Sequence, residues 1–264
     1  MNSYFYKKNP WWINQKFNFG ILRSKYLVQL SKNLSQRLIQ IITGLRRVGK
    51  STILLQLISC LIQKKRISPS TILFFSIEEP SLKGLSICEI INQFRAEHDL
   101  KVSQKIYVFI DEIQCRDGWE QEIKSLYDTE NIKFILNCSS ALLLSEKSSL
   151  LTGRYQKNKI NPLNFKEYLN FNGSEYNLNN DQLLVKQSEN YLLSGGMPEF
   201  VLYEPDRYLS TTIESILFKD LVSKFQLRNP KILEDLIFLL ADRVGSISSS
   251  LKLSNILQIN KDTV

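Results

Sequence analysis

A glycine-bounded, basic segment near residue 50 carries the clearest chemical signature of the chain. Residues 44–51 read GLRRVGKS, which fits the GxxxxGK[ST] pattern of a phosphate-binding loop. Such a loop wraps its backbone N–H groups around a phosphate, and the glycines permit a close approach that a Cβ would prevent. We expect Lys50 to reach the β- and γ-phosphates of a nucleotide and Ser51 to ligate Mg²⁺. The amino end of the following helix adds a favourable dipole.

The nucleotide contacts expected from this loop extend over its whole length. The candidate nucleotide-binding residues are Gly44, Leu45, Arg46, Arg47, Val48, Gly49, Lys50, Ser51 and Thr52. The two arginines either meet phosphate or acidic neighbours or are solvated, and both alternatives stay open. Chance produces the pattern in roughly one chain in a hundred of this length. Its position between an apolar strand and a helix favours the functional interpretation.

Two adjacent carboxylates follow another apolar run. Residues 106–110 read IYVFI and precede Asp111 and Glu112, the arrangement expected of a Walker B segment. Asp111 is the second candidate Mg²⁺ ligand. Glu112 is the candidate general base that polarises the attacking water. Apolar strands that end in an acid are common, so this interpretation depends on the phosphate loop that precedes it.

These motifs need parallel strands to bring them together. Strands are predicted at Leu38–Thr43, Thr71–Ser76, Ile106–Ile110 and Ile132–Leu136, with helices at Ser24–Asn33, Ser51–Lys64, Leu85–Ala96 and Trp119–Tyr127. Continuous apolar runs suit a parallel sheet that helices cover on both faces. Alternation of strand and helix over residues 37–161 therefore predicts an α/β fold, a doubly wound P-loop NTPase domain with its ligand site at the carboxyl ends of the strands.

The flanking segments are predicted to be mainly helical. Residues 1–36 form an N-terminal lead-in, residues 162–230 a helical lid and residues 231–264 a partial helix-turn-helix of the winged-helix type. The helices expected there are Phe165–Phe171, Asp181–Leu193, Arg207–Phe225, Lys231–Arg243 and Leu251–Gln258. Asn260 or Asp262 would cap a third helix, the one that enters a DNA major groove. The sequence ends at Val264, before this third helix, so DNA binding by this chain is only weakly supported. We interpret the chain as either a fragment or a short natural form.

Composition limits the class of protein. The chain has 264 residues, of which 43% are hydrophobic and 23% charged, as in ordinary globular proteins. Four cysteines without CxxC spacing and a single histidine argue against a zinc site and indicate reduced thiols. No signal peptide or membrane span is predicted, which indicates a cytoplasmic protein without a membrane partner. A net charge of +8 favours polyanions without choosing among them.

Several motifs, in the same order, resemble the archaeal-type AAA ATPase family. They are NPWW at 9–12, GLRRVGKS at 44–51, IDEIQ at 110–114 with Trp119, LTGR at 151–154, PLNFKE at 162–167 and GGMPE at 195–199. Members of that family are often joined to a winged-helix segment and a further C-terminal domain. The resemblance implies a P-loop ATPase that uses ATP and Mg²⁺. A homo-oligomer and a protein client are the further partners that we expect.

The resemblance adds two catalytic candidates. Arg154, in LTGR, resembles a sensor or finger arginine that neutralises charge on the transferred phosphoryl group, in its own subunit or in a neighbour; a structural ion pair is the alternative. Family members usually carry Thr-Gly-Ser where this chain has NCSS at 137–140. Asn137 can still orient water or the γ-phosphate, whereas Cys138 replaces a glycine of the family pattern.

Two functions compete on this basis. The first is an ATP hydrolase that couples turnover to movement of the lid and an attached module. The second is a nucleotide-dependent switch or DNA-associated regulator with little hydrolysis. A small-molecule kinase is disfavoured because the sequence shows no recognisable pocket for an acceptor substrate. A GTPase is disfavoured because NKD at 260–262 lacks the spacing of an NKxD motif. The three tryptophans are predicted to pack within the protein, and Gly195–Glu199 to form a turn that ends a helix.

Overall fold

The computed structural model describes residues 3–14, 16–139, 148–174, 181–222 and 230–260. The chain separates into two compact units, Met1–Glu204 and Pro205–Val264. The segment predicted as a lid is therefore divided. Its residues up to Glu204 fold with the sheet, and those from Pro205 onward fold with the C-terminal helices.

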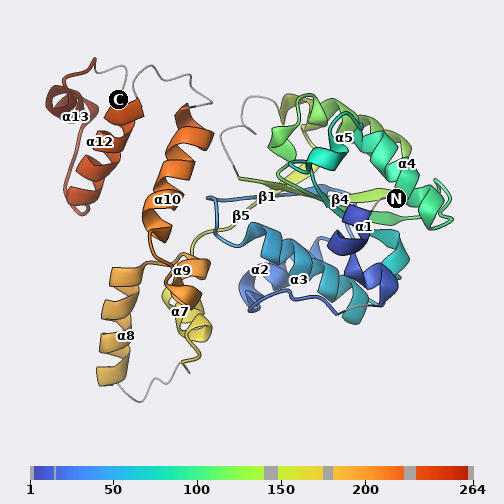
Figure 1. Ribbon diagram of the computed structural model, residues 1–264, viewed down its shortest axis with the longest axis horizontal. Helices are drawn as coiled ribbons and strands as arrows, with labels where there is room; N and C mark the ends of the chain where they lie inside the picture. Colours follow the sequence, from blue (N-terminus) through green and yellow to red (C-terminus); the bar gives the residue numbers. More distant parts are fainter. Residues whose placement is uncertain (1–2, 15, 140–147, 175–180, 223–229, 261–264) are drawn as a thin grey trace. The chain divides into compact units, whose positions relative to one another are not determined.

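A five-stranded parallel sheet forms the centre of the first unit (Figure 1). Its strands are β1 (Ile39–Thr43), β2 (Ile72–Ser76), β3 (Ile106–Asp111), β4 (Ile132–Cys138) and β5 (Tyr155–Lys159). They lie in the order β2-β3-β4-β1-β5, and each neighbouring pair is parallel. β4 therefore lies between the strand before the phosphate loop and the strand that ends at Asp111. The predicted α/β fold of a P-loop NTPase is confirmed.

Helices cover both faces of this sheet (Figure 1). The helices α2 (Ser24–Lys32) and α3 (Lys50–Gln63) cover one face, and α4 (Ile87–Glu97) and α5 (Trp119–Thr129) cover the other. The short helical segments of this part are α1 (Ser3–Lys8), η1 (Pro10–Ile13), η2 (Pro69–Thr71), η3 (Pro80–Leu82), η4 (Ile113–Cys115) and η5 (Ser148–Leu151).

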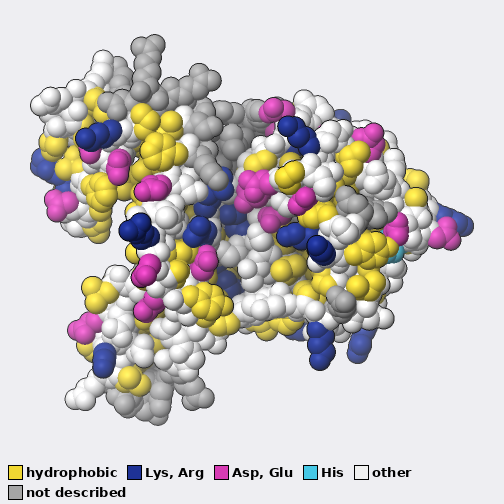
Figure 2. Space-filling view, viewed as in Figure 1, with side chains coloured by type: hydrophobic (Ala, Val, Ile, Leu, Met, Phe, Trp, Pro, Cys, Tyr) yellow, Lys and Arg dark blue, Asp and Glu magenta, His cyan; other side chains and the backbone are white. Residues whose placement is uncertain are grey.

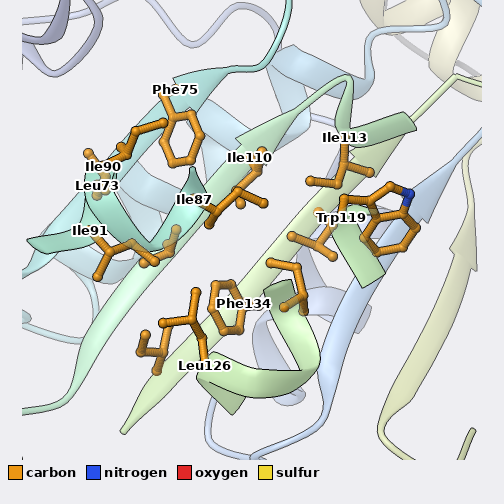
Figure 3. Packing of buried hydrophobic residues seen from close by; sticks show 14 of the residues in the cluster. Leu73, Phe75, Ile87, Ile90, Ile91, Ile110, Ile113, Trp119, Leu126 and Phe134 are labelled. Carbon is orange, nitrogen blue, oxygen red and sulfur yellow. The ribbon is translucent and has the colours of Figure 1, made fainter. Parts of the chain in front are cut away.

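Alternate residues of the strands face opposite layers. In β2, Leu73 and Phe75 belong to the core under α4 and α5, whereas Ile72 and Phe74 belong to the core under α2 and α3. Figure 3 shows the first of these cores, with Phe75 among the side chains that point between the strands and the helices. Burying each such side chain contributes about 1.5–3 kcal/mol, which explains why β2 is apolar from Ile72 to Phe75.

The N-terminal segment covers the open edge of β2. The side chain of Asn9 pairs with Phe74 as a neighbouring strand would: its Nδ2 donates to the carbonyl at 2.9 Å and its Oδ1 accepts from the N–H at 2.7 Å. Trp11 and Trp12 donate their ring N–H groups to the carbonyl of Ile72 at 3.2 and 2.8 Å. The NPWW motif thus closes a sheet edge that would otherwise be open to pairing with other chains.

Three helices follow β5 within the first unit, namely α7 (Phe165–Phe171), α8 (Asp181–Ser194) and α9 (Pro198–Tyr203). A capping box between Asn164 and Glu167 starts α7. The N–H of Leu163 donates to the carbonyl of Gly196 at 2.7 Å, and a Cβ on Gly196 would lie 2.4 Å from the carbonyl oxygen of Leu163. The second glycine of GGMPE is therefore required by this close backbone contact, which sets where α9 begins.

The C-terminal unit is helical. It contains α10 (Tyr208–Ser215), the π-helix η6 (Ile216–Val222), α12 (Pro230–Asp242) and α13 (Ser250–Leu257). The single helix predicted over 207–225 is therefore an α-helix that continues as a π-helix as far as Val222, and residues 223–225 lie outside the described residues. The predicted capping position Asp262 lies outside the described residues. Within the described parts of the chain, no helix has the length and apolar character needed to cross a membrane.

Candidate nucleotide-binding and catalytic site

The predicted phosphate loop connects β1 to α3 at the carboxyl end of the sheet. Gly49, the N-cap of α3, has a φ of 88°, a backbone region that favours glycine. A Cβ on Gly44 would lie 2.3 Å from the carbonyl oxygen of Ile160, because the chain that leaves β5 crosses the start of the loop. The first glycine is therefore required by backbone packing within the protein as well as by the loop itself.

The ammonium of Lys50 lies over this loop. Its Nζ donates to the carbonyl of Leu45 at 2.8 Å, and the residue is only 4% exposed. Burial lowers the pKa of Lys50 from its ordinary value, and the carboxylates of Glu112 and Asp111 oppose that change. The predicted phosphate-binding cation and the predicted acidic pair are thus close enough to interact electrostatically.

Asp111 connects the predicted Mg²⁺ ligands with Asn137. Its carboxylate accepts hydrogen bonds from the hydroxyl of Ser51 and from the Nδ2 of Asn137. Burial raises the pKa of Asp111, and the hydrogen bond from Ser51 opposes this rise. Since Mg²⁺ prefers oxygen ligands, the adjacent hydroxyl and carboxylate fit the ion. The structure brings together all three of these predicted site residues.

Unpaired polar atoms also lie at this edge of the sheet. Asn137 is fully buried on β4. Within the described ranges, the buried oxygens Oδ1 of Asn137, Oγ1 of Thr43 and Oε1 of Gln114 have no hydrogen-bond partner. Buried polar atoms are normally paired, so orphans beside a phosphate loop suit a site that is completed by a ligand and its waters. The Cys138 that replaces a glycine of the family pattern ends β4 and is fully buried, and Ser140 lies outside the described residues.

Glu112 is half-buried and has a φ of 51°, in the left-handed region. Its carboxylate accepts a hydrogen bond from Nε2 of Gln114, and the same Nε2 donates to Oγ of Ser139 at 2.7 Å. The sequence marks Gln114 only as part of the IDEIQ motif. A role in orienting Glu112 becomes visible only when β4 brings Ser139 beside it.

A cavity of about 410 Å³ lies beside the phosphate loop, within the first unit. One wall is polar and includes Lys50, Ser51 and Glu112. The remaining walls come from α7, α9 and the segment 18–23, here called the strap; they are formed by Gly20, Ile21, Arg23, Phe171, Pro198, Glu199, Leu202 and Tyr203. An anion-binding end next to largely apolar walls suits a ligand with a polyphosphate chain and a flat ring.

Arg23 is a residue of this site that the sequence does not single out. It is 3% exposed, and its guanidinium donates to the carbonyls of Val48 and Asn161 at 3.0 Å each. It also forms a bidentate pair with Glu167, at 3.0 and 2.9 Å. Arg23 therefore joins the strap, the phosphate loop and α7. No local motif can reveal it, because its partners are distant in the sequence.

The two loop arginines remain close to protein groups. Arg47 has a φ of 63° and lies 3.9 Å from the carboxylate of Glu199 on α9, with both side chains substantially exposed. Arg46 is half-buried and lies near enough to Lys50 to contribute to the lowering of its pKa. For Arg47 the structure therefore supplies the acidic neighbour that the sequence left as one alternative.

Arg154 does not lie at this site. Its carbonyl accepts from the N–H of Ile39 at 2.9 Å, at the amino end of β1, whereas the phosphate loop leaves the carboxyl end. With a rise of about 3.3 Å per residue, the strand separates the two by roughly 17–20 Å. The guanidinium forms an ion pair with Asp128 at 3.1 Å. The structure thus contains the ion pair that was the alternative, and action on a neighbouring subunit stays a prediction.

The fold and the phosphate loop define a P-loop nucleotide-binding protein. Residues 36–169, about half of the chain, match the family described as an AAA domain. The chain belongs to this AAA domain family of ATPases. Residues 185–264 match a domain of unknown function.

Relatives occur in bacteria and archaea. An uncharacterized protein of Haemophilus influenzae is 34% identical over 90% of this chain and 59% of its own length. Two uncharacterized proteins of Methanocaldococcus jannaschii are 30% and 28% identical, over 95% and 83% of this chain and 58% and 50% of their own lengths. The chain therefore spans between 50% and 59% of the length of these relatives.

Solved structures with a similar chain path have low sequence identity. ORC1 of Aeropyrum pernix, solved in complex with DNA, has a TM-score of 0.47 and 13% identity, over 90% of this chain and 77% of its own. PCH-2 of C. elegans has a TM-score of 0.39 and 16% identity, over 56% of this chain and 42% of its own. Such a likeness carries no information on ligand or partner.

Proposed function

We propose that this protein binds ATP with Mg²⁺ and hydrolyses it, and that turnover moves the helices α7–α9 and an attached module. The observation that carries the proposal is the convergence of Lys50, Ser51, Asp111 and Glu112 at one edge of the sheet. Lys50, Ser51 and Glu112 also line the same cavity. Binding, metal ligation and general-base chemistry each have a group of the required type there.

Each residue then has a definite task. Lys50 and the backbone N–H groups of the loop hold the β- and γ-phosphates, while Ser51 and Asp111 hold Mg²⁺. When bound, Mg²⁺ neutralises charge that develops on the phosphate oxygens. Glu112 accepts a proton from the water whose oxygen bonds to the γ-phosphorus as the bond to the ADP oxygen breaks. Asn137, next to Asp111, orients that water or the γ-phosphate through its amide.

The helices α7 and α9 are placed to respond to the loop. Arg47 of the loop faces Glu199 at the start of α9, and Cγ of Pro198 lies 3.9 Å from where a Cβ of Gly49 would stand. Arg23 contacts both Val48 in the loop and Glu167 in α7. A change in loop geometry on binding or release of phosphate would therefore be transmitted directly to these helices.

One observation favours the second function, a nucleotide-dependent switch or DNA-associated regulator with little hydrolysis. Gln114 donates to the carboxylate of Glu112 and so competes with a catalytic water for that acceptor. Under either function, we also propose that the C-terminal helices are part of a winged-helix segment, that the protein forms a homo-oligomer and acts on a protein client, and that it is cytoplasmic. On the face of the sheet-containing unit visible in Figure 2, acidic and basic side chains are interspersed, which gives DNA binding by that face little support.

Phosphate release with Mg²⁺ and ATP tests this proposal. We expect release by the wild type, no release by Lys50→Ala, and a loss of about 10²–10⁴-fold in Glu112→Gln with ATP binding retained. The assay is run at several protein concentrations, since a rate per subunit that rises with concentration indicates a homo-oligomer. ATP binding without phosphate release by the wild type would support the switch, and release that ignores both substitutions would overturn the assignment.

A further inference from the structure

The strap that forms one wall of the cavity is held by a single buried side chain of α3. Gln56 is 1% exposed. Its Nε2 donates to the carbonyls of Phe19 and Ile21 at 3.1 and 2.8 Å, and its Oε1 accepts from the N–H of Arg23 at 3.2 Å. Both amide hydrogens and one oxygen lone pair are therefore used on the strap backbone.

The same helix carries the phosphate-binding residues. Lys50 and Ser51 lie in its first turn, and Gln56 follows on the next part of the helix. Burying an amide is costly unless it is hydrogen-bonded, and here the strap supplies all of the bonds. Together with the bond from Arg23 to Val48, Gln56 therefore fixes the position of the strap relative to the phosphate loop, so that the two walls of the cavity keep a set separation.

The strap conformation itself is restricted. Gly20 has a φ of 64°, and a Cβ there would lie 3.0 Å from the methyl group of Thr52. Its N–H is bonded to Oδ1 of Asn18 at 2.8 Å. Within the described ranges, no hydrogen bond involves the carbonyl of Gly20 or the N–H of Ile21, and both residues line the cavity. Bonding to the polar edge of a ligand would satisfy these backbone groups.

We infer that Gln56 is a positioning residue for recognition of the nucleoside part of the nucleotide, through its hold on the strap. This inference rests on the proposed ATP binding. A phosphate loop of this kind would hold the polyphosphate chain, whereas the strap and the apolar residues of α7 and α9 surround the rest of the cavity. Loss of the Gln56 bonds therefore weakens the contribution of the base and sugar to binding and leaves the phosphate contribution unchanged.

Comparison of two ligands separates this role from a merely structural one. Tripolyphosphate carries the anionic chain of ATP without the nucleoside, so its affinity reports on the loop alone. Titration calorimetry with Mg²⁺ gives both dissociation constants for the wild type, for Gln56→Met, which keeps the side-chain length but cannot pair with the strap, and for Gln63→Met. Gln63 lies exposed near the end of the same helix and serves as the matched control.

We expect Gln56→Met to bind ATP about tenfold more weakly, equivalent to about 1.4 kcal/mol. Its affinity for tripolyphosphate stays within about twofold of the wild type, and Gln63→Met matches the wild type for both ligands. An equal loss of affinity for both ligands, or no loss for either, overturns the inference while ATP binding by the wild type still supports the proposed function. If the wild type binds neither ligand, the proposed function fails as well.

A second variant keeps the test decisive if Gln56→Met does not fold. Gly20→Ala changes an exposed residue outside the buried core and displaces the strap through its Cβ and its φ. It is expected to show the same selective loss of ATP affinity. A ratio of ATP to tripolyphosphate affinity equal to that of the wild type would overturn the inference.

Discussion

Asp111 is an acidic residue at a position where burial disfavours the charged form. Burial raises its pKa above the ordinary value of 3.8. Between the unfolded and the folded pKa the native state binds more protons than the unfolded state, so the free energy of unfolding falls as pH rises through that interval. At pH values above the folded pKa, the cost of the buried charge is fully present. A site arranged to receive Mg²⁺ would show this cost in the absence of the ion.

The first prediction follows from that cost. Asp111→Asn keeps an acceptor for Asn137 and removes the buried charge, so the nucleotide-free protein should be more stable at neutral pH, with Tm higher by about 2–4 °C for a gain of about 1 kcal/mol. Thermal unfolding followed by circular dichroism measures this, with the exposed Asp117→Asn as control. A variant less stable than the wild type would show that the carboxylate stabilises the fold.

The second prediction concerns Arg154 and its partner. If the site is formed within one subunit, Arg154→Ala and Asp128→Ala should each leave kcat for ATP within about threefold of the wild type. Arg154 lies at the opposite end of β1 from the phosphate loop, and its exposed ion pair contributes little to stability. Steady-state phosphate release at low and high protein concentration provides the measurement. A loss of about a hundredfold in Arg154→Ala alone, with Asp128→Ala unaffected, would instead assign the arginine to a neighbouring subunit's site.

At the scale of elements, how far each strand could be predicted depends on its burial. The sequence predicts β1 to β4 because both faces of these strands are buried and most of their residues are apolar, with Gln40, Lys133 and Asn137 among the buried polar exceptions. It does not predict β5, whose sequence YQKNK lies at a sheet edge and has only Asn158 buried. Strand pairing with β1 alone gives that segment its conformation, and this pairing leaves no apolar pattern.

The candidate site, like the sheet, could be predicted only where its residues form a local sequence pattern. Gly44–Ser51 and Asp111–Glu112 carry local patterns, because phosphate binding and metal ligation need fixed residue types at fixed spacing. Arg23 and Gln56 have no such pattern, since their partners are backbone atoms from other parts of the chain. A polar side chain whose function is to hold backbone can be recognised only when the fold is known.

The third prediction belongs to the edge of the sheet. Asn9→Leu removes both bonds to Phe74 and leaves buried backbone groups unpaired, so the free energy of unfolding should fall by about 2–3 kcal/mol. Urea unfolding measures the loss, and light scattering should detect association through the exposed edge of β2. Asn92→Leu, at an exposed position of α4, is the control. Equal stability of the two variants would contradict the role assigned to NPWW.

At the scale of the whole molecule, the cavity belongs to one unit. Its lining residues extend only to Tyr203, and the first unit ends at Glu204. The C-terminal unit, which overlaps the matched domain of unknown function, contributes no lining residue among those described. The residues expected to bind the nucleotide therefore lie in a continuous segment of the chain that ends before the C-terminal unit begins.

The fourth prediction tests this separation. A fragment ending at Glu204 should bind ATP with a dissociation constant within about threefold of the full chain, which is less than about 0.7 kcal/mol. Equilibrium dialysis with labelled ATP compares the two proteins. Loss of binding in a fragment whose circular dichroism shows a folded α/β domain would mean that the C-terminal unit completes the site.

The central claim is that the loop 44–51 binds a nucleotide. Titration calorimetry of wild type and Lys50→Ala with Mg²⁺ and ATP tests it most directly. We predict one ATP per chain for the wild type and a dissociation constant at least about a hundredfold larger for Lys50→Ala, equivalent to about 2.8 kcal/mol. Equal affinity of the two proteins for ATP, or no binding by the wild type, would contradict the account.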